Sequence, residues 1–181
     1  MINWRFVTTM ITIRKASQGD IQTLSRRFLL FLEDKNSKIF QENVTKLGIP
    51  EEYVRKALAE ETLIKAATTG KATFYIALED DEIVGFAQTI QQEVKTAELD
   101  RIVVFPTHES KGIGTQLLKQ AVEDVKKKGT EVIVVNAGKN ETHARRFYEK
   151  NGFKLVKEVT IDAPWGKKLD LATYQLQLCS S

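Results

Sequence analysis

The chain has 181 residues, of which 42% are hydrophobic, so it is long enough for one substantial core, and we assign residues 10–181 to a single domain. Its 27 basic and 24 acidic residues leave a net charge of only +3 without a long block of like charge, which argues against a nucleic-acid partner. The single cysteine, Cys179, excludes an intramolecular disulfide, and the two histidines lie in unlike contexts, so we expect no metal site.

The N-terminal segment, residues 1–9, contains Asn3 and Arg5 and lacks the apolar run of a signal peptide or a membrane span. We therefore expect a cytoplasmic protein without a membrane partner. A cleaner strand pattern begins at Met10, so residues 1–9 are interpreted as an N-terminal extension.

The next segment predicts a strand followed by a helix. Ile11 and Ile13 alternate with polar residues as in a strand, and Ser17 with Asp20 resembles the capping box at the start of a helix. The apolar face of this helix carries Ile21, Leu24, Phe28 and Leu32.

A polar connection leads to Pro50, which is typical of a helix start, and Gly70 ends this second predicted helix. Two β-rich runs follow, at 72–78 and 82–91. They are joined by Glu79-Asp80-Asp81, which predicts an antiparallel hairpin.

The second half of the chain alternates strands and helices. A strand at 97–105 precedes a turn, a helix at 112–129 and a strand at 131–135, and this order implies parallel pairing with a right-handed crossover. A last helix at about 141–150 leads to two closing strands at 153–161 and 169–178. The predicted fold class is α/β. Its sheet is mixed, with antiparallel strands as in α+β proteins and one parallel crossover.

The turn before the 112–129 helix predicts an anion site. Gly112 and Gly114 let the backbone approach a ligand closely, and the free N–H groups of the first helical turn point toward it. Lys111 adds a positive charge. A phosphate or pyrophosphate would fit such a turn.

Two common phosphate-binding motifs do not account for this turn. The dinucleotide-binding fingerprint requires a third glycine, but this sequence has Leu117 at that position. The fingerprint also requires an acidic residue at the far end of the next strand, whereas Glu131 lies at the start of that strand. A Walker loop is excluded because no Lys-Ser/Thr pair follows a glycine at the required interval.

Two further patterns occur in order along the chain. The first is Glu109-Ser-Lys-Gly-Ile-Gly114, followed by Leu117-Leu118, and the second is Asn140-Glu-Thr-His-Ala-Arg-Arg-Phe-Tyr-Glu-Lys-Asn-Gly-Phe153. Together they resemble the GNAT-type N-acetyltransferase superfamily. Glu109 departs from the Arg or Gln usual in that family, so we expect its side chain to point away from the anion.

The resemblance implies a GNAT fold, in which a twisted, mostly antiparallel sheet with one parallel crossover has helices on both faces. It also implies acetyl-CoA as co-substrate, bound as a wedge between diverging strands beside a bulge in the 97–105 strand. The residues implied to contact this cofactor are Ile102, Val103, Val104, Lys111, Gly112, Ile113, Gly114, Thr115 and Asn140.

The chemistry implied is attack of a primary amine on the thioester. The amine must first lose a proton, and Glu98, Asp100 or a water chain could receive it, with Glu98 favoured; the two acids share one face if no bulge intervenes. Tyr148 matches the tyrosine of the family that reprotonates the departing thiolate.

For the acceptor we favour a small cationic amine such as a polyamine, because the second predicted helix carries Glu51, Glu52, Glu60 and Glu61. A protein N-terminus, a lysine side chain and an aminoglycoside stay open. A different class of function is a non-catalytic acyl-CoA-binding regulatory module. The closing strands could also pair across a homodimer.

Overall fold

The computed structural model describes residues 10–178, so the proposed extension at residues 1–9 and Cys179 lie outside the described residues. The elements follow in the order β1 (Ile11–Lys15), α1 (Gln18–Glu33), α2 (Lys38–Phe40), the π-helix η1 (Gln41–Lys46), α3 (Glu51–Leu58), α4 (Glu60–Thr68), β2 (Ala72–Glu79), β3 (Glu82–Glu93), β4 (Thr96–Val104), α5 (Ile113–Lys127), β5 (Val132–Gly138), α6 (Thr142–Lys150), β6 (Lys154–Asp162) and β7 (Lys168–Gln177).

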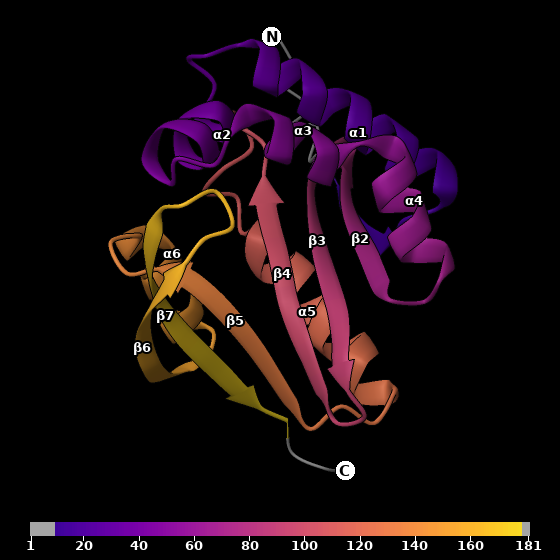
Figure 1. Ribbon diagram of the computed structural model, residues 1–181. Coiled ribbons are helices and arrows are strands. Elements are labelled where there is room, and N and C mark those ends of the chain that lie inside the picture. The colour runs from indigo at the N-terminus through magenta and orange to yellow at the C-terminus, as the bar shows by residue number, and fades with distance from the viewer. Residues whose placement is uncertain (1–9, 179–181) are drawn as a thin grey trace, which may run out of the picture.

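The strands form one seven-stranded sheet in the order β1-β2-β3-β4-β5-β7-β6 (Figure 1). Neighbouring strands are antiparallel except β4 and β5, which are parallel and connected through α5. This arrangement confirms the predicted mixed sheet with a single parallel crossover.

Helices cover both faces of the sheet, as predicted. On one face, α1 to α4 pack over β2 and β3 around a cluster that includes Leu24, Phe28, Phe74 and Phe86. On the other face, α5 and α6 pack around a second cluster that includes Leu117, Ile133, Tyr148 and Tyr174. Figure 1 shows α5 behind the sheet and α1 to α4 at its upper end and right side. The alternation of apolar residues along β2 and β3 supplies both cores.

Local signals in the sequence act as predicted at two places. The Ser17 hydroxyl accepts the Asp20 N–H at 3.3 Å, and the Ser17 N–H donates to the Asp20 carboxylate at 2.7 Å, which completes the capping box of α1. Between β2 and β3, Asp80 and Asp81 have φ values of 49° and 64°, as the primed turn of a tight hairpin requires.

The predicted second helix is divided in two. Ala59 adopts an extended conformation (φ −62°, ψ 140°) and separates α3 from α4. The carbonyl freed at the end of α3, that of Leu58, accepts the buried Ser25 hydroxyl at 2.7 Å. The connection predicted to be polar and irregular contains α2 and η1, whose Ile39 and Phe40 reach the core. Tertiary packing therefore decides the structure of this segment.

No helix within residues 10–178 is both long and apolar enough to cross a membrane. In the same part of the chain, His, Cys, Asp and Glu side chains form no group of three or more that could hold a metal ion.

An ionic network centred on the buried Asp124 carboxylate connects the far end of α5 to the sheet. The Asp124 carboxylate accepts the Tyr75 hydroxyl at 2.7 Å and lies 2.6 Å from Lys15 Nζ and 3.0 Å from Lys128 Nζ. Burial alone would raise the pKa of Asp124, but the hydrogen bonds from Lys15, Tyr75 and Lys128 outweigh it and lower this pKa to about 2.

We expect Asp124→Asn to lower the free energy of unfolding by about 2 kcal/mol at pH 7, because the folded state favours the ionised carboxylate. A lowered pKa stabilises the fold above about pH 4, and this contribution is lost as the pH falls toward 2. Urea unfolding followed by circular dichroism at pH 7, 4 and 2.5 measures both effects.

Asp162→Asn is the matched control, since the Asp162 side chain is 82% exposed in its pair with Lys168 and should contribute less than about 0.5 kcal/mol. If Asp124→Asn and the unchanged protein lose stability in parallel between pH 4 and 2.5, the assignment to Asp124 is wrong.

Candidate active site

The parallel strands β4 and β5 pair over three residues and then separate. Thr96 is opposite Val132, Ala97 is opposite Ile133, and Glu98 is opposite Val134, where the pairing ends. Beyond this point β5 stays paired with β7 as far as Gly138, and β4 stays paired with β3. Figure 1 shows β4 and β5 meeting at their lower ends and spreading apart toward α2 and α3. The separation exposes one edge of β4 to a ligand.

A bulge in β4 lies directly after the last β4–β5 pair. Leu99 is opposite Thr89 of β3 and Arg101 is opposite Gln88, so Asp100 is the extra residue. The predicted bulge is therefore present, although earlier in the strand than Val103 and Val104, and its extra residue is one of the two candidate bases. The Asp100 carboxylate is exposed and accepts Arg101 Nε at 3.1 Å.

The loop from β4 to α5 folds into a concave backbone turn. Thr107, Ser110 and Gly112 all have positive φ values, of 76°, 64° and 76°. The first backbone bond into α5 runs from the Gln116 N–H to the Gly112 carbonyl at 3.1 Å, so the N–H groups of the three preceding residues are available to a ligand. Such a turn at a helix N-terminus attracts an anion.

The charged side chains of this loop are paired with side chains of other elements. Glu109 pairs with Lys38 of α2. Lys111 Nζ lies 3.2 Å from Glu79 Oε1, and His108 Nδ1 lies 2.7 Å from Glu79 Oε2, in a geometry that is not a hydrogen bond. Burial would raise the pKa of Glu79, but its contacts with Lys111 and His108 lower it. The positive charge of Lys111, which was predicted to attract the anion, is thus partly neutralised by Glu79.

The helix α6 brings its motif against this turn. A Cβ placed on Gly114 would lie 3.5 Å from the Phe147 ring and 3.7 Å from Val104 Cγ2, so β4, α5 and α6 meet there. Ile113 is buried in the core and offers the site only its backbone. Tyr148 is 7% exposed, and burial, aided by Glu141, raises its pKa to about 12, so its hydroxyl is protonated at neutral pH.

Glu98 belongs to a group of polar side chains that the sequence did not reveal. Its carboxylate accepts Gln92 Nε2 of β3 and Asn136 Nδ2 of β5, the latter at 3.3 Å. Asn136 Oδ1 in turn accepts the Thr173 hydroxyl of β7 at 2.8 Å. The only signal in the sequence was a polar residue at the end of a hydrophobic strand, and the partners are too distant in sequence to be linked.

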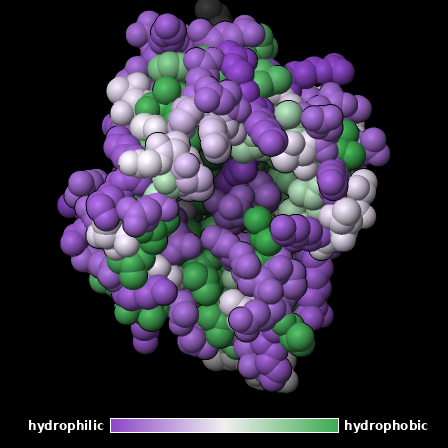
Figure 2. Space-filling model, viewed as in Figure 1, coloured by the Kyte–Doolittle hydropathy of each residue, from purple (hydrophilic) through white to green (hydrophobic). Residues whose placement is uncertain are grey.

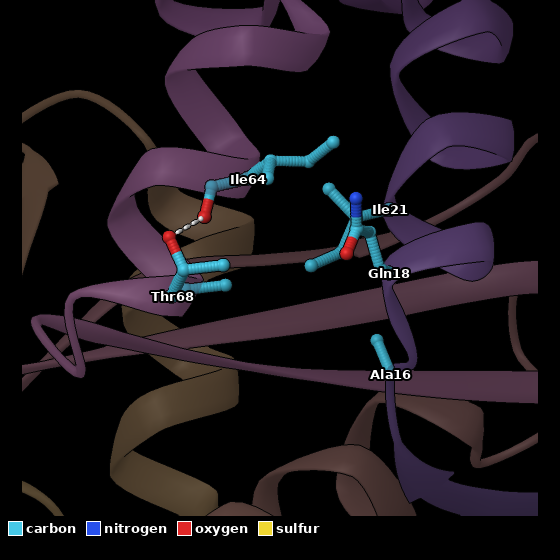
Figure 3. Close-up of a pocket in the computed structure, with 6 residues that line it drawn as sticks. Ala16, Gln18, Ile21, Ile64 and Thr68 are labelled. Carbon is cyan, nitrogen blue, oxygen red and sulfur yellow. Dashed lines mark hydrogen bonds between the residues drawn. The ribbon is translucent and has the colours of Figure 1, made fainter.

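Figure 2 shows a hollow near the centre of this face, with hydrophilic and hydrophobic side chains around it. A separate pocket of about 140 Å³ lies between α1 and α4 and is lined by Ala16, Gln18, Ile21, Ile64, Ala67 and Thr68 (Figure 3). This pocket is smaller than a typical ligand site and contains none of the predicted site residues.

The structure thus gathers most of the predicted residues at one place, but some remain apart from it. Asn140 is an exposed turn residue, and its carbonyl accepts the Thr142 N–H at 3.0 Å. Among the acidic residues proposed to attract a cation, Glu51 pairs with Arg55 at 2.7 Å and Glu60 accepts Gln22 Nε2 at 2.8 Å. The charge of Glu51 is therefore partly compensated within the protein, whereas Glu60 has only a neutral partner.

Comparison with known proteins gives a family match. The model of the acetyltransferase (GNAT) family matches residues 37–153, which is more than half of the chain. The uncharacterised N-acetyltransferase YvbK of Bacillus subtilis is 32% identical over 81 residues, which are 45% of this chain and 52% of that protein, so the chain spans about half the length of this relative. The spermidine N(1)-acetyltransferase of Thermoplasma acidophilum is 29% identical over 145 residues, covering 80% of this chain and 89% of that protein.

Among solved structures, the acetyltransferase yncA from Salmonella typhimurium with its cofactor acetyl-CoA has a TM-score of 0.66 at 19% identity. The match covers 94% of this chain and 95% of that one. The likeness confirms the predicted fold.

Proposed function

The chain belongs to the acetyltransferase (GNAT) family, and we propose that it transfers the acetyl group of acetyl-CoA to a small cationic primary amine such as a polyamine. The observation that carries this proposal is the separation of β4 from β5 after Glu98, with an anion-binding turn at one end of the gap and a carboxylate at the other. The likeness to a spermidine N(1)-acetyltransferase supports the choice of acceptor.

The residues around the gap between β4 and β5 fit acetyl-CoA, the acetyl donor. The concave turn offers the N–H groups of Ile113, Gly114 and Thr115 to the pyrophosphate, and the Lys111 ammonium can leave Glu79 to join it. A Cβ at Gly112 would meet no atom within 4 Å, so the corner is open to a ligand. The edge of β4 from Ile102 to Val104, which β5 leaves free, can bond the amides of the pantetheine arm. Acetyl-CoA supplies the acetyl group as an activated thioester.

Glu98 is the better placed of the two candidate bases. It lies at the last paired residue of β4, where the gap begins, and its partners Gln92 and Asn136 are uncharged amides. The Asp100 carboxylate is instead paired with the Arg101 guanidinium at 3.1 Å, so one of its oxygens is already occupied. In this proposal the amine gives a proton to Glu98, directly or through water, and its lone pair becomes the nucleophile.

Tyr148 is the proposed proton donor to the leaving sulfur. The hydroxyl has no hydrogen-bond partner among residues 10–178, and its pKa of about 12 keeps it protonated over the physiological range. Packing against Phe147, Phe153 and Tyr174 fixes the ring at the junction of α6 with the sheet. A neutral donor held in this way can transfer a proton as negative charge develops on sulfur.

The acceptor assay tests the proposal as a whole. Thiol release from acetyl-CoA is measured with spermidine, spermine, an aminoglycoside and peptides with free N-termini. We expect kcat/KM for the polyamines to exceed that for the peptides by at least about tenfold, because a small polycation can reach the Glu98 carboxylate at the start of the gap between β4 and β5. A preferred peptide would instead identify a protein acetyltransferase, and no acceleration by any amine would identify a non-catalytic acyl-CoA-binding module.

Gly112→Ala should weaken CoA binding about tenfold, as measured by calorimetry. Alanine is strained at a φ of 76°, so the turn relaxes and its N–H groups lose their common direction. Gly129→Ala is the matched control, because Gly129 lies just beyond the other end of α5 with a φ of 87° and equal free space. Both variants should lose about 1 kcal/mol of stability. Equal affinity for CoA in the two variants would remove the turn from the cofactor site.

Tyr148→Phe should lower kcat about 100-fold with little change in the affinity for acetyl-CoA, because only the proton donor is removed. Tyr75→Phe serves as control: this tyrosine is also buried in the core on the α5 side of the sheet, and its hydroxyl binds Asp124. It should reduce stability and leave turnover intact. A Tyr148→Phe enzyme that releases thiol at the normal rate would contradict the assignment.

A further inference from the structure

Four polar side chains from four neighbouring strands form a hydrogen-bonded row across the sheet. The row runs from Gln92 on β3 through Glu98 on β4 and Asn136 on β5 to Thr173 on β7. It crosses the sheet where β4 and β5 begin to separate. Ala97 and Leu99, which flank Glu98, belong to the core beneath α5, so the row lies on the opposite face.

Thr173 determines the direction of the Asn136 amide. The two residues are directly opposite each other in the β5–β7 pairing, and the Thr173 hydroxyl donates to Asn136 Oδ1 at 2.8 Å. The amide nitrogen of Asn136 must then face the other way, toward Glu98 Oε1 at 3.3 Å. Asn136 is exposed, but Thr173 is only 6% exposed. Little water therefore competes for the hydrogen bond between Thr173 and Asn136, which sets the orientation of the amide.

We propose that Asn136 and Thr173 are positioning residues for acetyl transfer, which hold the Glu98 carboxylate at the start of the gap between β4 and β5. This inference rests on the proposed role of Glu98 as the base. Gln92 and Asn136 each donate to a different carboxylate oxygen, which fixes the plane of the group. Each oxygen keeps a free lone pair for the proton of the amine. Because both donors are neutral, they orient Glu98 without the stronger competition of a cation.

The test compares Thr173→Val, which removes the hydroxyl at nearly constant volume, with Thr173→Ser, which retains it. We expect Thr173→Val to lower kcat about tenfold while the KM for acetyl-CoA changes less than about twofold, since a misplaced base slows the proton transfer but not cofactor binding. Thr173→Ser should restore kcat to within about twofold of the original. Asn136→Ala, at an exposed position, should match Thr173→Val.

Thr160→Val is the control for the loss of a threonine hydroxyl from a strand. The Thr160 hydroxyl donates to Asp170 at 2.5 Å across β6 and β7, outside the row, and its removal should leave kcat unchanged. Thermal unfolding of each variant separates a loss of folded protein from a loss of rate. The inference is wrong if Thr173→Ser and Thr173→Val have the same kcat, or if Asn136→Ala retains full turnover.

A double-mutant cycle with Glu98→Gln separates this inference from the function on which it rests. If Thr173 acts through Asn136 on Glu98, Thr173→Val should change kcat less than about twofold in a Glu98→Gln background. An equal tenfold loss in both backgrounds would overturn the positioning role and leave Glu98 as the base. Full turnover of Glu98→Gln alone would instead disprove the base, and with it any role for the row.

Discussion

The end of the β4–β5 pairing at Glu98 is the constraint on which the proposed site depends. A strand that leaves its neighbour in the middle of a sheet exposes backbone groups that would normally be bonded. Beyond Glu98, β5 stays paired with β7 as far as Gly138, and β4 stays paired with β3. The bulge at Asp100 increases the twist of β4 near the last β4–β5 pair. After the bulge, each of the two strands follows its other neighbour.

The loop above this gap combines a strained backbone with compensated charges. Thr107 has a positive φ, which is unfavourable for a β-branched residue, and the surrounding contacts must hold it there. Lys38 binds Glu109, and Glu79 binds both Lys111 and His108, so the loop is anchored to α2 and to the end of β2. Glu79 also offsets the charge of Lys111 before a phosphate arrives. When a pyrophosphate binds, Lys111 would exchange its contact with the Glu79 carboxylate for one with the pyrophosphate.

Much of the fold follows from local patterns in the sequence. The capping box at Ser17, the primed turn at Asp80 and Asp81 and the left-handed Gly112 are each a short-range effect of particular residue types. The break at Ala59 and the bulge at Asp100 have no such signal, because neither position carries glycine or proline. They arise from packing and strand pairing with distant segments. For the site, the motifs located the turn and α6, but the partners of Glu98 come from two other strands, and Thr173 behind Asn136 comes from a third.

The position of the site also follows from how the two cores are filled. The core beneath α5 and α6 extends across the sheet from Tyr75 to Tyr174, whereas the core beneath α1 to α4 is built on β2 and β3 and ends near Val103. Within residues 10–178, the apolar cluster beneath α1 to α4 does not include β5 or β7, so polar residues such as Asn136 and Thr173 can occupy the outer face of these two strands. A hydrogen-bonded row is stable there because one end is shielded by packing and the other reaches solvent. The uncovered half of the sheet is therefore where a substrate can approach Glu98.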